Sequence, residues 1–131
     1  MRLSAFSVAA IAISALFVPA VSAAEGSDAH DAAAIFKLRC GACHGDPNVK
    51  GAPSRLGPDL IALNGRPAAA ASFPRYSPGL KASKLVWDKK TLDAFLLNPR
   101  GTVRGTTMAF PGLKDAGERA AVVAYVLGAK E

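Results

Sequence analysis

The feature that most constrains this chain is the segment Cys40-Gly41-Ala42-Cys43-His44. Two cysteines three residues apart lie on one side of a helical turn, and a histidine follows the second cysteine at once. This arrangement lets two thiols add to the two vinyl groups of one haem while the imidazole reaches the iron from the same side. Because C-x-x-C-H is the attachment signature of c-type haem, the segment predicts one covalent haem c, held through Cys40 and Cys43, with His44 as an iron ligand.

Three other interpretations of the same residues compete with haem attachment. A thioredoxin-like redox pair also uses C-x-x-C, but in a βαβ setting and usually after a tryptophan, whereas Leu38-Arg39 precede the pair here. A structural zinc site needs four ligands, and only the distant His30 could complete a set with the motif. A structural disulfide would not require the histidine. Haem attachment accounts for both cysteines and the histidine together.

The N-terminal segment predicts export. Met1-Arg2 gives a positive start, residues 3–18 are almost entirely apolar, and Val21-Ser22-Ala23 is a small-residue cleavage pattern. We therefore expect residues 1–23 to be a secretory signal peptide and residues 24–131 to form one monohaem domain in the periplasm. An uncleaved membrane anchor is the alternative, although the apolar run is shorter than the ~20 residues of a typical span. An oxidising compartment suits thioether attachment, which uses both cysteines and leaves none for a disulfide.

The chain is basic, with 16 lysines and arginines against 10 acidic residues and a net charge of +6. A basic surface of this size favours acidic partner faces and raises the rate at which partners meet it. Nucleic acid is the general alternative for a basic protein, but the basic residues are scattered along a chain that we expect to be exported. The charge therefore predicts protein partners and no nucleic acid.

Helical spacing of apolar residues predicts an all-α chain. A first helix is expected from Ser27 or Asp28 to Cys40, another from the cap Asp88 to Asn98-Pro99, and a last one from near Asp115 to Gly128. A short helix is expected over residues 78–83, since Ser77-Pro78 has the order of a cap followed by proline. Residues 45–55, 64–76 and 100–111 are expected to be loops, and no segment predicts a convincing strand.

The inward faces of these helices follow from the same spacing. They comprise Ile35 and Phe36, then Leu92, Phe95 and Leu96, and finally Val122, Tyr125 and Val126. Asp115 and Glu118 resemble a capping box at the start of the last helix. The expected fold has three main helices, short helices and long loops wrapped around one haem. So small a domain would be marginal alone, and the haem is expected to serve as most of its core.

Two residues outside the motif are candidates for completing the iron site. Pro58 offers a carbonyl but no amide donor, and this carbonyl could accept a bond from the second nitrogen of His44 and orient the ring. Met108 is the one thioether left once Met1 departs with the signal, and it lies in a loop, so we expect it to be the second axial ligand. A methionine that merely fills the core is the plain alternative. His30 is the rival ligand, although it lies at the start of a helix leading straight to the motif.

With these residues in view, the chain resembles the class I c-type cytochromes, the family of mitochondrial cytochrome c and its small soluble bacterial relatives. The resemblance covers most of residues 24–131. Gly57-Pro58-Asp59-Leu60 resembles the family's loop whose proline carbonyl accepts from the haem-ligand histidine, and residues 105–112 resemble its methionine-ligand loop. Phe36 and Tyr125 resemble its contact between the first and last helices.

The resemblance also implies a set of haem contacts. It places Arg66, Tyr76 and Trp87 near the buried haem propionate and Phe95 beside the methionine sulfur. The residues expected to hold or surround the haem are Cys40, Cys43, His44, Pro58, Arg66, Tyr76, Trp87, Phe95 and Met108. Of these, His44 and Met108 are the expected iron ligands.

Four positions depart from the family pattern. Phe95 stands where many relatives have a tyrosine, and Leu80 replaces a usual asparagine of the internal water network. Both changes bear on redox tuning. Thr107 stands where a lysine is common, and the loop after His44 is longer by two residues. These two changes bear on which partner docks.

The resemblance implies a one-electron carrier, not an enzyme, that shuttles between respiratory or photosynthetic membrane complexes. Expected partners are a quinol-oxidising complex, a terminal oxidase or a dehydrogenase, met by a monomer that touches membranes only through them. Candidates for a basic docking rim around the haem edge are Lys81, Lys84, Lys89, Lys90, Arg100, Arg104 and Lys114. A dedicated cytochrome subunit of one periplasmic dehydrogenase is the first alternative. A haem peroxidase is the second, and it would need an open iron position that Met108 is expected to fill.

Overall fold

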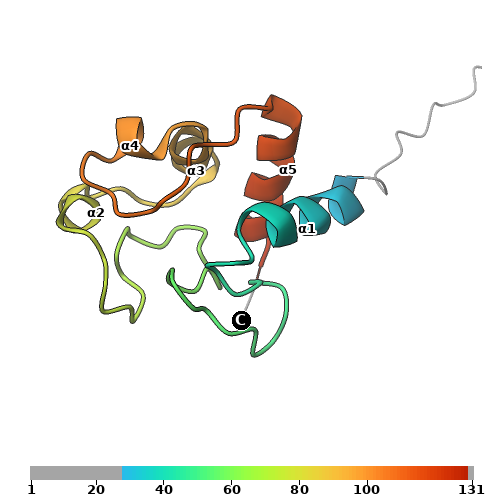
Figure 1. Ribbon diagram of the computed structural model, residues 1–131, viewed down its shortest axis with the longest axis horizontal. Helices are drawn as coiled ribbons and strands as arrows, with labels where there is room; N and C mark the ends of the chain where they lie inside the picture. The colour runs from blue at the N-terminus through green and yellow to red at the C-terminus, as the bar shows by residue number, and fades with distance from the viewer. Residues whose placement is uncertain (1–27, 130–131) are drawn as a thin grey trace, which may run out of the picture.

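The computed structural model describes residues 28–129, and within them it has five helices joined by long loops (Figure 1). They are α1 (Asp28–Arg39), α2 (Pro78–Ala82), α3 (Lys89–Leu97), α4 (Pro99–Thr102) and α5 (Ala116–Leu127). The β-pairing among these residues is one isolated bridge between Pro67 and Val86, so the predicted all-α class is confirmed. None of the helices in this range is long and apolar enough to cross a membrane. The predicted signal peptide, residues 1–23, lies outside the described residues.

Helices α1 and α5 cross and pack against each other, as Figure 1 shows near the C-terminal end of α5. Phe36 of α1 is 1% exposed, and its ring centroid lies 5.6 Å from that of Tyr125 on α5. Val122, also 1% exposed, belongs to the same cluster of buried side chains. The predicted contact between the first and last helices is therefore present. It fixes the end of α1, from which the C-x-x-C-H motif continues.

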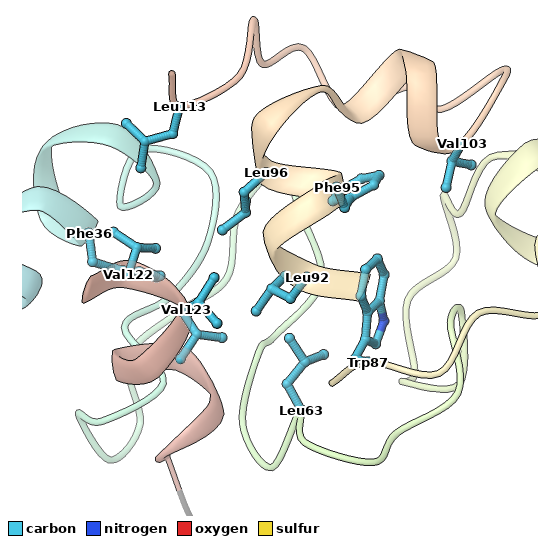
Figure 2. Close-up of a cluster of buried hydrophobic side chains, with 11 residues drawn as sticks. Phe36, Leu63, Trp87, Leu92, Phe95, Leu96, Val103, Leu113, Val122 and Val123 are labelled. Carbon is cyan, nitrogen blue, oxygen red and sulfur yellow. The ribbon is translucent and has the colours of Figure 1, made fainter. Parts of the chain in front are cut away.

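Helix α3 lies against both α5 and α4 and supplies the centre of the apolar core (Figure 2). Asp88 caps it: the carboxylate accepts from the Thr91 amide at 2.7 Å, and the Asp88 amide donates to the Thr91 hydroxyl at 2.9 Å. This reciprocal pair is a capping box. The predicted inward residues Leu92, Phe95 and Leu96 are buried.

Helix α4 is a difference from the sequence prediction, which treated residues 100–111 as a loop. Pro99 both ends α3 and begins a new turn, because its fixed backbone angle suits the first position of a helix. The Asn98 side chain caps this turn by accepting from the Gly101 amide at 3.1 Å. Thr102 then donates its hydroxyl to the Ala94 carbonyl at 2.9 Å, which holds the turn against α3.

Helix α5 begins where the sequence predicted, but its capping differs in one detail. Asp115 accepts from the Glu118 amide at 2.8 Å. The returning bond from the Glu118 side chain to the Asp115 amide, which a full capping box requires, is not among the hydrogen bonds of the described residues. The helix ends at Leu127, and Gly128 follows it in a right-handed conformation with a φ of −80°.

In the long segment between α1 and α3, two short stretches of backbone are hydrogen-bonded to each other. The Gly65 amide donates to the Trp87 carbonyl at 2.7 Å, and the Trp87 amide donates to the Arg66 carbonyl at 3.0 Å. The Ala68 amide donates to the Leu85 carbonyl at 2.7 Å. These bonds bring residues 65–68 beside residues 85–87, immediately before α3, and so place Arg66 next to Trp87.

Candidate functional site

The C-x-x-C-H motif continues the last turn of α1. The Cys40 and Gly41 amides both donate to the Phe36 carbonyl, at 2.8 and 3.0 Å, and the Cys43 and His44 amides both donate to the Cys40 carbonyl, at 3.0 and 2.9 Å. Both cysteines are half-buried free thiols, so the disulfide interpretation is not realised. Burial, with a smaller effect of Cys43, raises the pKa of the Cys40 thiol to about 11. Two free thiols, those of Cys40 and Cys43, therefore lie three residues apart on one helical turn.

The imidazole of His44 is oriented by the carbonyl predicted for that role. His44 Nδ1 donates to the Pro58 carbonyl oxygen at 2.8 Å. Burial lowers the pKa of His44, and the bond to Pro58 opposes that shift. Because Nδ1 carries the donated proton, the neutral ring presents Nε2 with a free electron pair, which is the form that binds metals.

The backbone just before Pro58 lies close to the His44 ring. Three successive amides, those of Arg55, Leu56 and Gly57, converge on the Cys43 carbonyl at 3.3, 3.2 and 3.0 Å. A Cβ atom on Gly57 would lie 2.3 Å from Cε1 of His44, so a larger residue here would displace the ring. The loop after His44 therefore closes back on the motif and fixes the ring in place.

Arg66 is tied to the segment that follows Pro58. Its guanidinium donates to the Asp59 carboxylate at 3.3 Å, to the Asp59 carbonyl at 2.8 Å and to the Ile61 carbonyl at 2.8 Å. Tyr76 lies near the charges of both Arg66 and Asp59. Burial is the main effect that raises the pKa of Tyr76, Arg66 opposes this rise, and Asp59 adds to it. The structure thus groups two of the predicted propionate contacts, Arg66 and Tyr76, around Asp59.

Trp87 and Phe95 are two aromatic members of the apolar cluster and contact each other. Trp87 is 7% exposed, and its ring meets Phe95 edge to face at 5.2 Å between centroids. Figure 2 shows the two side chains next to each other on the same side of α3. Met108 is half-buried and packs against this same cluster. The predicted second ligand and the residue predicted to lie beside it therefore belong to one apolar group.

Met108 lies in a segment that we call the Met108 loop, residues 103–115, between α4 and α5. Val103 at its start and Leu113 near its end are buried, 3% and 5% exposed. The Met108 amide donates to the Thr106 hydroxyl at 3.3 Å, and the Phe110 amide donates to the Met108 carbonyl at 3.0 Å. The loop is therefore pinned at its two ends, with Met108 between them.

These side chains fit a covalent haem. Two free thiols stand on one turn, one imidazole has a single free nitrogen, and a thioether packs on the apolar cluster. Half-buried apolar residues suited to a macrocycle edge also pack against this cluster, among them Leu60, Ala68, Leu80 and Phe110. Among the described side chains, no group of three or more His, Cys, Asp or Glu could hold a metal ion.

Sequence reasoning missed three polar residues that organise the site's surroundings. Arg119 of α5 is buried and pairs with Asp93 of α3 at 2.8 Å. Asp46, two residues after His44, accepts from the Tyr125 hydroxyl at 2.9 Å. Arg119 is buried on α5 together with Val122, Val123 and Val126. A charged residue within an apolar helix face was therefore the sequence signal that could have indicated an ion pair.

A helical domain with two thiols and a histidine on one turn, and a thioether packed on its apolar cluster, defines the class of covalent haem proteins. Comparison with known proteins identifies the family within that class. The cytochrome c family model matches residues 29–130. The chain is 40% identical over 92 residues to cytochrome c of Ginkgo biloba, covering 70% of this chain and 80% of that protein. It is 38% identical over 103 residues to cytochrome c of Guizotia abyssinica, covering 79% and 91% of the two chains.

A third relative, cytochrome c of Theileria parva, is 38% identical over 108 residues, which cover 82% of this chain and 90% of that protein. The chain belongs to the cytochrome c family. It is therefore an electron carrier with haem c bound covalently through Cys40 and Cys43. The predicted family, fold class and cofactor are confirmed.

Proposed function

We propose that this chain is a periplasmic one-electron carrier whose haem iron is held by His44 and Met108. Residues 1–23 direct export and are removed, and residues 24–131 form the single working domain. The observation that carries the proposal is the bond from His44 Nδ1 to the Pro58 carbonyl at 2.8 Å. It commits one ring nitrogen and orients the other, which is how proteins fix a histidine ligand.

The second ligand is proposed from chemistry and position together. Met108 packs half-buried against the cluster that contains Trp87 and Phe95, and its loop is pinned at both ends. A haem with one histidine and one methionine ligand has a raised potential and cycles between ferric and ferrous iron without an open position for substrate. The role of the protein is then to hold both donor atoms, exclude water from them and keep Nδ1 of His44 protonated.

The polar group around Asp59 has a proposed role in the same site. Arg66 is 19% exposed at its side chain and donates to Asp59 and Ile61. Together with Tyr76 and Trp87, it is proposed to face the inner haem propionate. A half-buried guanidinium held by two carbonyls and one carboxylate still has positive charge available for a second anion.

The proposed docking surface is basic, and the proposed partners are acidic. The members of the predicted rim are all exposed: Lys81, Lys84, Lys89, Lys90, Arg100, Arg104 and Lys114. Lys114 donates to the Leu97 carbonyl at 2.7 Å, so it is the least free of the set. Exposed charges of this kind accelerate encounter and weaken with salt, which suits a carrier that must also leave its partner.

One set of spectra tests the ligation. In the oxidised holoprotein purified from an exporting host, we expect the far-red sulfur–iron band in the parent and in His30→Ala, and its loss in Met108→Ala. The His30 variant is the matched control, because His30 is the rival ligand. Persistence of the band in Met108→Ala, or its absence from the parent, would contradict the proposed ligation.

Location and carrier status are tested on the same preparation. Intact mass of the periplasmic protein should equal residues 24–131 plus one haem, whereas a retained N-terminal segment would contradict removal of the signal. A free carrier should elute as a monomer at high salt. Co-purification with one dehydrogenase at high salt would instead favour the dedicated-subunit alternative.

A further inference from the structure

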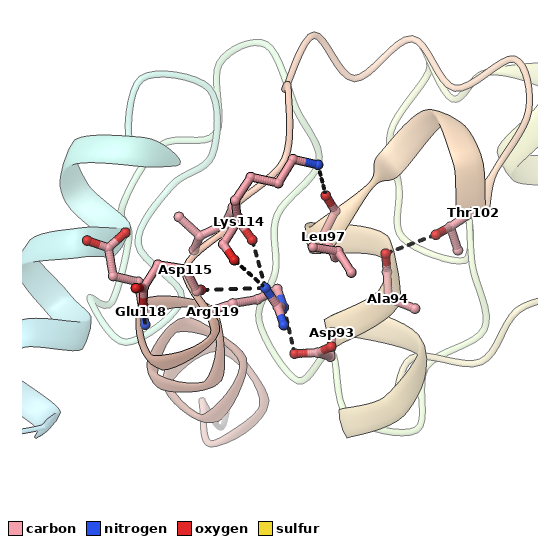
Figure 3. Close-up of polar contacts among 9 residues, drawn as sticks. Asp93, Ala94, Leu97, Thr102, Lys114, Asp115, Glu118 and Arg119 are labelled. Atoms are coloured by element: carbon pink, nitrogen blue, oxygen red, sulfur yellow. Dashed lines mark hydrogen bonds and ion pairs between the residues drawn. The ribbon is translucent and has the colours of Figure 1, made fainter.

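An ion pair between Arg119 and Asp93 lies at the exit of the Met108 loop. Arg119 of α5 is 9% exposed, which is unusual for a charged residue. Its Nε donates to the Asp93 carboxylate of α3 at 2.8 Å, and its Nη1 donates to the Leu113 carbonyl at 2.9 Å. The same Nη1 also reaches the carbonyls of Lys114 and Asp115, at 3.3 and 3.5 Å (Figure 3). One guanidinium thus joins α3 to the last three residues of the loop.

Two further contacts fasten the same end of the loop to α3. The Leu113 amide donates to the Leu96 carbonyl at 2.8 Å, and Lys114 Nζ donates to the Leu97 carbonyl at 2.7 Å. Gly112 has a φ of +100°, and a Cβ there would lie 2.3 Å from the Leu97 carbonyl oxygen. The loop exit therefore runs in close contact with the C-terminal end of α3.

The entry of the loop is held by α4, which is itself bonded to α3 through Thr102. The Val103 amide donates to the Pro99 carbonyl at 2.9 Å, and the Thr102 hydroxyl donates to the Ala94 carbonyl at 2.9 Å. Between these two fastenings, the hydrogen bonds of residues 104–112 in the described structure stay within the loop. The position of Met108 thus depends on side-chain packing and on how firmly the two ends are held.

We propose that Arg119 and Asp93 form a positioning pair that holds the exit of the Met108 loop to α3 and thereby keeps the Met108 sulfur in place. This inference rests on the ligation proposed above. Arg119 is the link because it alone among the exit contacts bonds both to α3 and to three successive loop carbonyls in the described structure. Removing the Asp93 charge leaves the Arg119 guanidinium buried without its anion, which is unfavourable. The bonds from Arg119 to the loop carbonyls are then weakened as well.

The pair should act on the opening of the loop more than on the fold as a whole. The Arg119 side chain is 11% exposed and that of Asp93 is 40% exposed, so neutralising Asp93 is an isosteric change at a partly exposed site. An added ligand such as imidazole binds the iron only when the sulfur has left. Its apparent affinity therefore rises with the fraction of molecules whose loop is open.

The test compares Asp93→Asn with two other variants of the holoprotein. Tyr125→Phe is the matched control, since it removes a hydroxyl bond to Asp46 at 2.9 Å from the same helix α5 but leaves the loop exit intact. Asp93→Glu keeps the charge and serves as the rescue. Imidazole binding, followed by loss of the far-red band, should tighten about tenfold in Asp93→Asn, the effect of losing one charge-assisted hydrogen bond. It should change less than about twofold in the other two variants.

A second measurement does not depend on the ligation. Amide hydrogen exchange within residues 103–115 should accelerate in Asp93→Asn and stay at the parent rate in Tyr125→Phe. Equal tightening in Asp93→Asn and Tyr125→Phe, or unchanged exchange in Asp93→Asn, would overturn the positioning role. If the parent lacks the far-red band, Met108 ligation is wrong, and the exchange rates still decide whether the pair fastens the loop.

Discussion

The contact between α1 and α5 should be the most sensitive point of the apolar core to truncation. Phe36 is 1% exposed and its ring lies 5.6 Å from that of Tyr125. Removing a buried phenylalanine ring costs about 3–5 kcal/mol in lost transfer energy and cavity formation. The ring pair contributes about 0.5–1.5 kcal/mol of its own. We therefore expect Phe36→Ala to lower the free energy of unfolding by about 4 kcal/mol, a large part of the roughly 5–15 kcal/mol that holds a domain together.

Equilibrium denaturation of the holoprotein, followed by circular dichroism, measures this loss. Leu38→Ala is the matched control, because Leu38 lies on the same helix and is 78% exposed. Its unfolding free energy should stay within about 0.5 kcal/mol of the parent. A loss below about 1 kcal/mol in Phe36→Ala, or an equal loss in both variants, would refute the packing argument.

Three further changes probe the site and its supporting helix. In Gly57→Ala the new Cβ would lie 2.3 Å from Cε1 of His44, so the ring must move. Exchange of the His44 Nδ1 proton, measured by NMR, should therefore accelerate. An unchanged exchange rate would show that the backbone of the loop moves and the ring does not. Phe95→Tyr should change the midpoint potential by tens of millivolts, where about 59 mV is a tenfold shift for one electron; a potential equal to the parent would mean that Phe95 does not face the ligand sulfur. The backbone and side-chain hydrogen bonds of Thr91 lower the pKa of Asp88, so its stabilisation is present above the unfolded pKa and is lost as pH falls through the folded one. Asp88→Asn should therefore show a smaller fall in unfolding midpoint between pH 6 and pH 3 than the parent, and an equal fall would contradict this assignment.

Local signals in the sequence predicted most of the helices. Asp88 caps α3 and Ser77 caps α2, because an oxygen-bearing side chain before a helical run satisfies the first free amides. Phe36 was predicted to be buried from helical spacing alone. Helix α4 was missed because a single turn leaves no periodic pattern, and only the order Asn98-Pro99 marks it.

Long-range polar contacts were the part that the sequence could not supply. The bond between His44 and Pro58 was predicted, because a proline carbonyl near a candidate ligand has a known use. The pair of Arg119 and Asp93 joins residues 26 positions apart, and its formation depends on how α3 and α5 pack. No local propensity encodes that distance, so a charge on an apolar helix face was the one visible sign of it.

The measurement that tests the account most directly is haem staining of a denaturing gel. The account states that haem is bound covalently through Cys40 and Cys43, which are half-buried free thiols on the turn after α1. The parent should carry stain after denaturation, each single Cys→Ala variant should carry less or none, and the double variant should carry none. A double variant that still bound haem covalently would contradict the account.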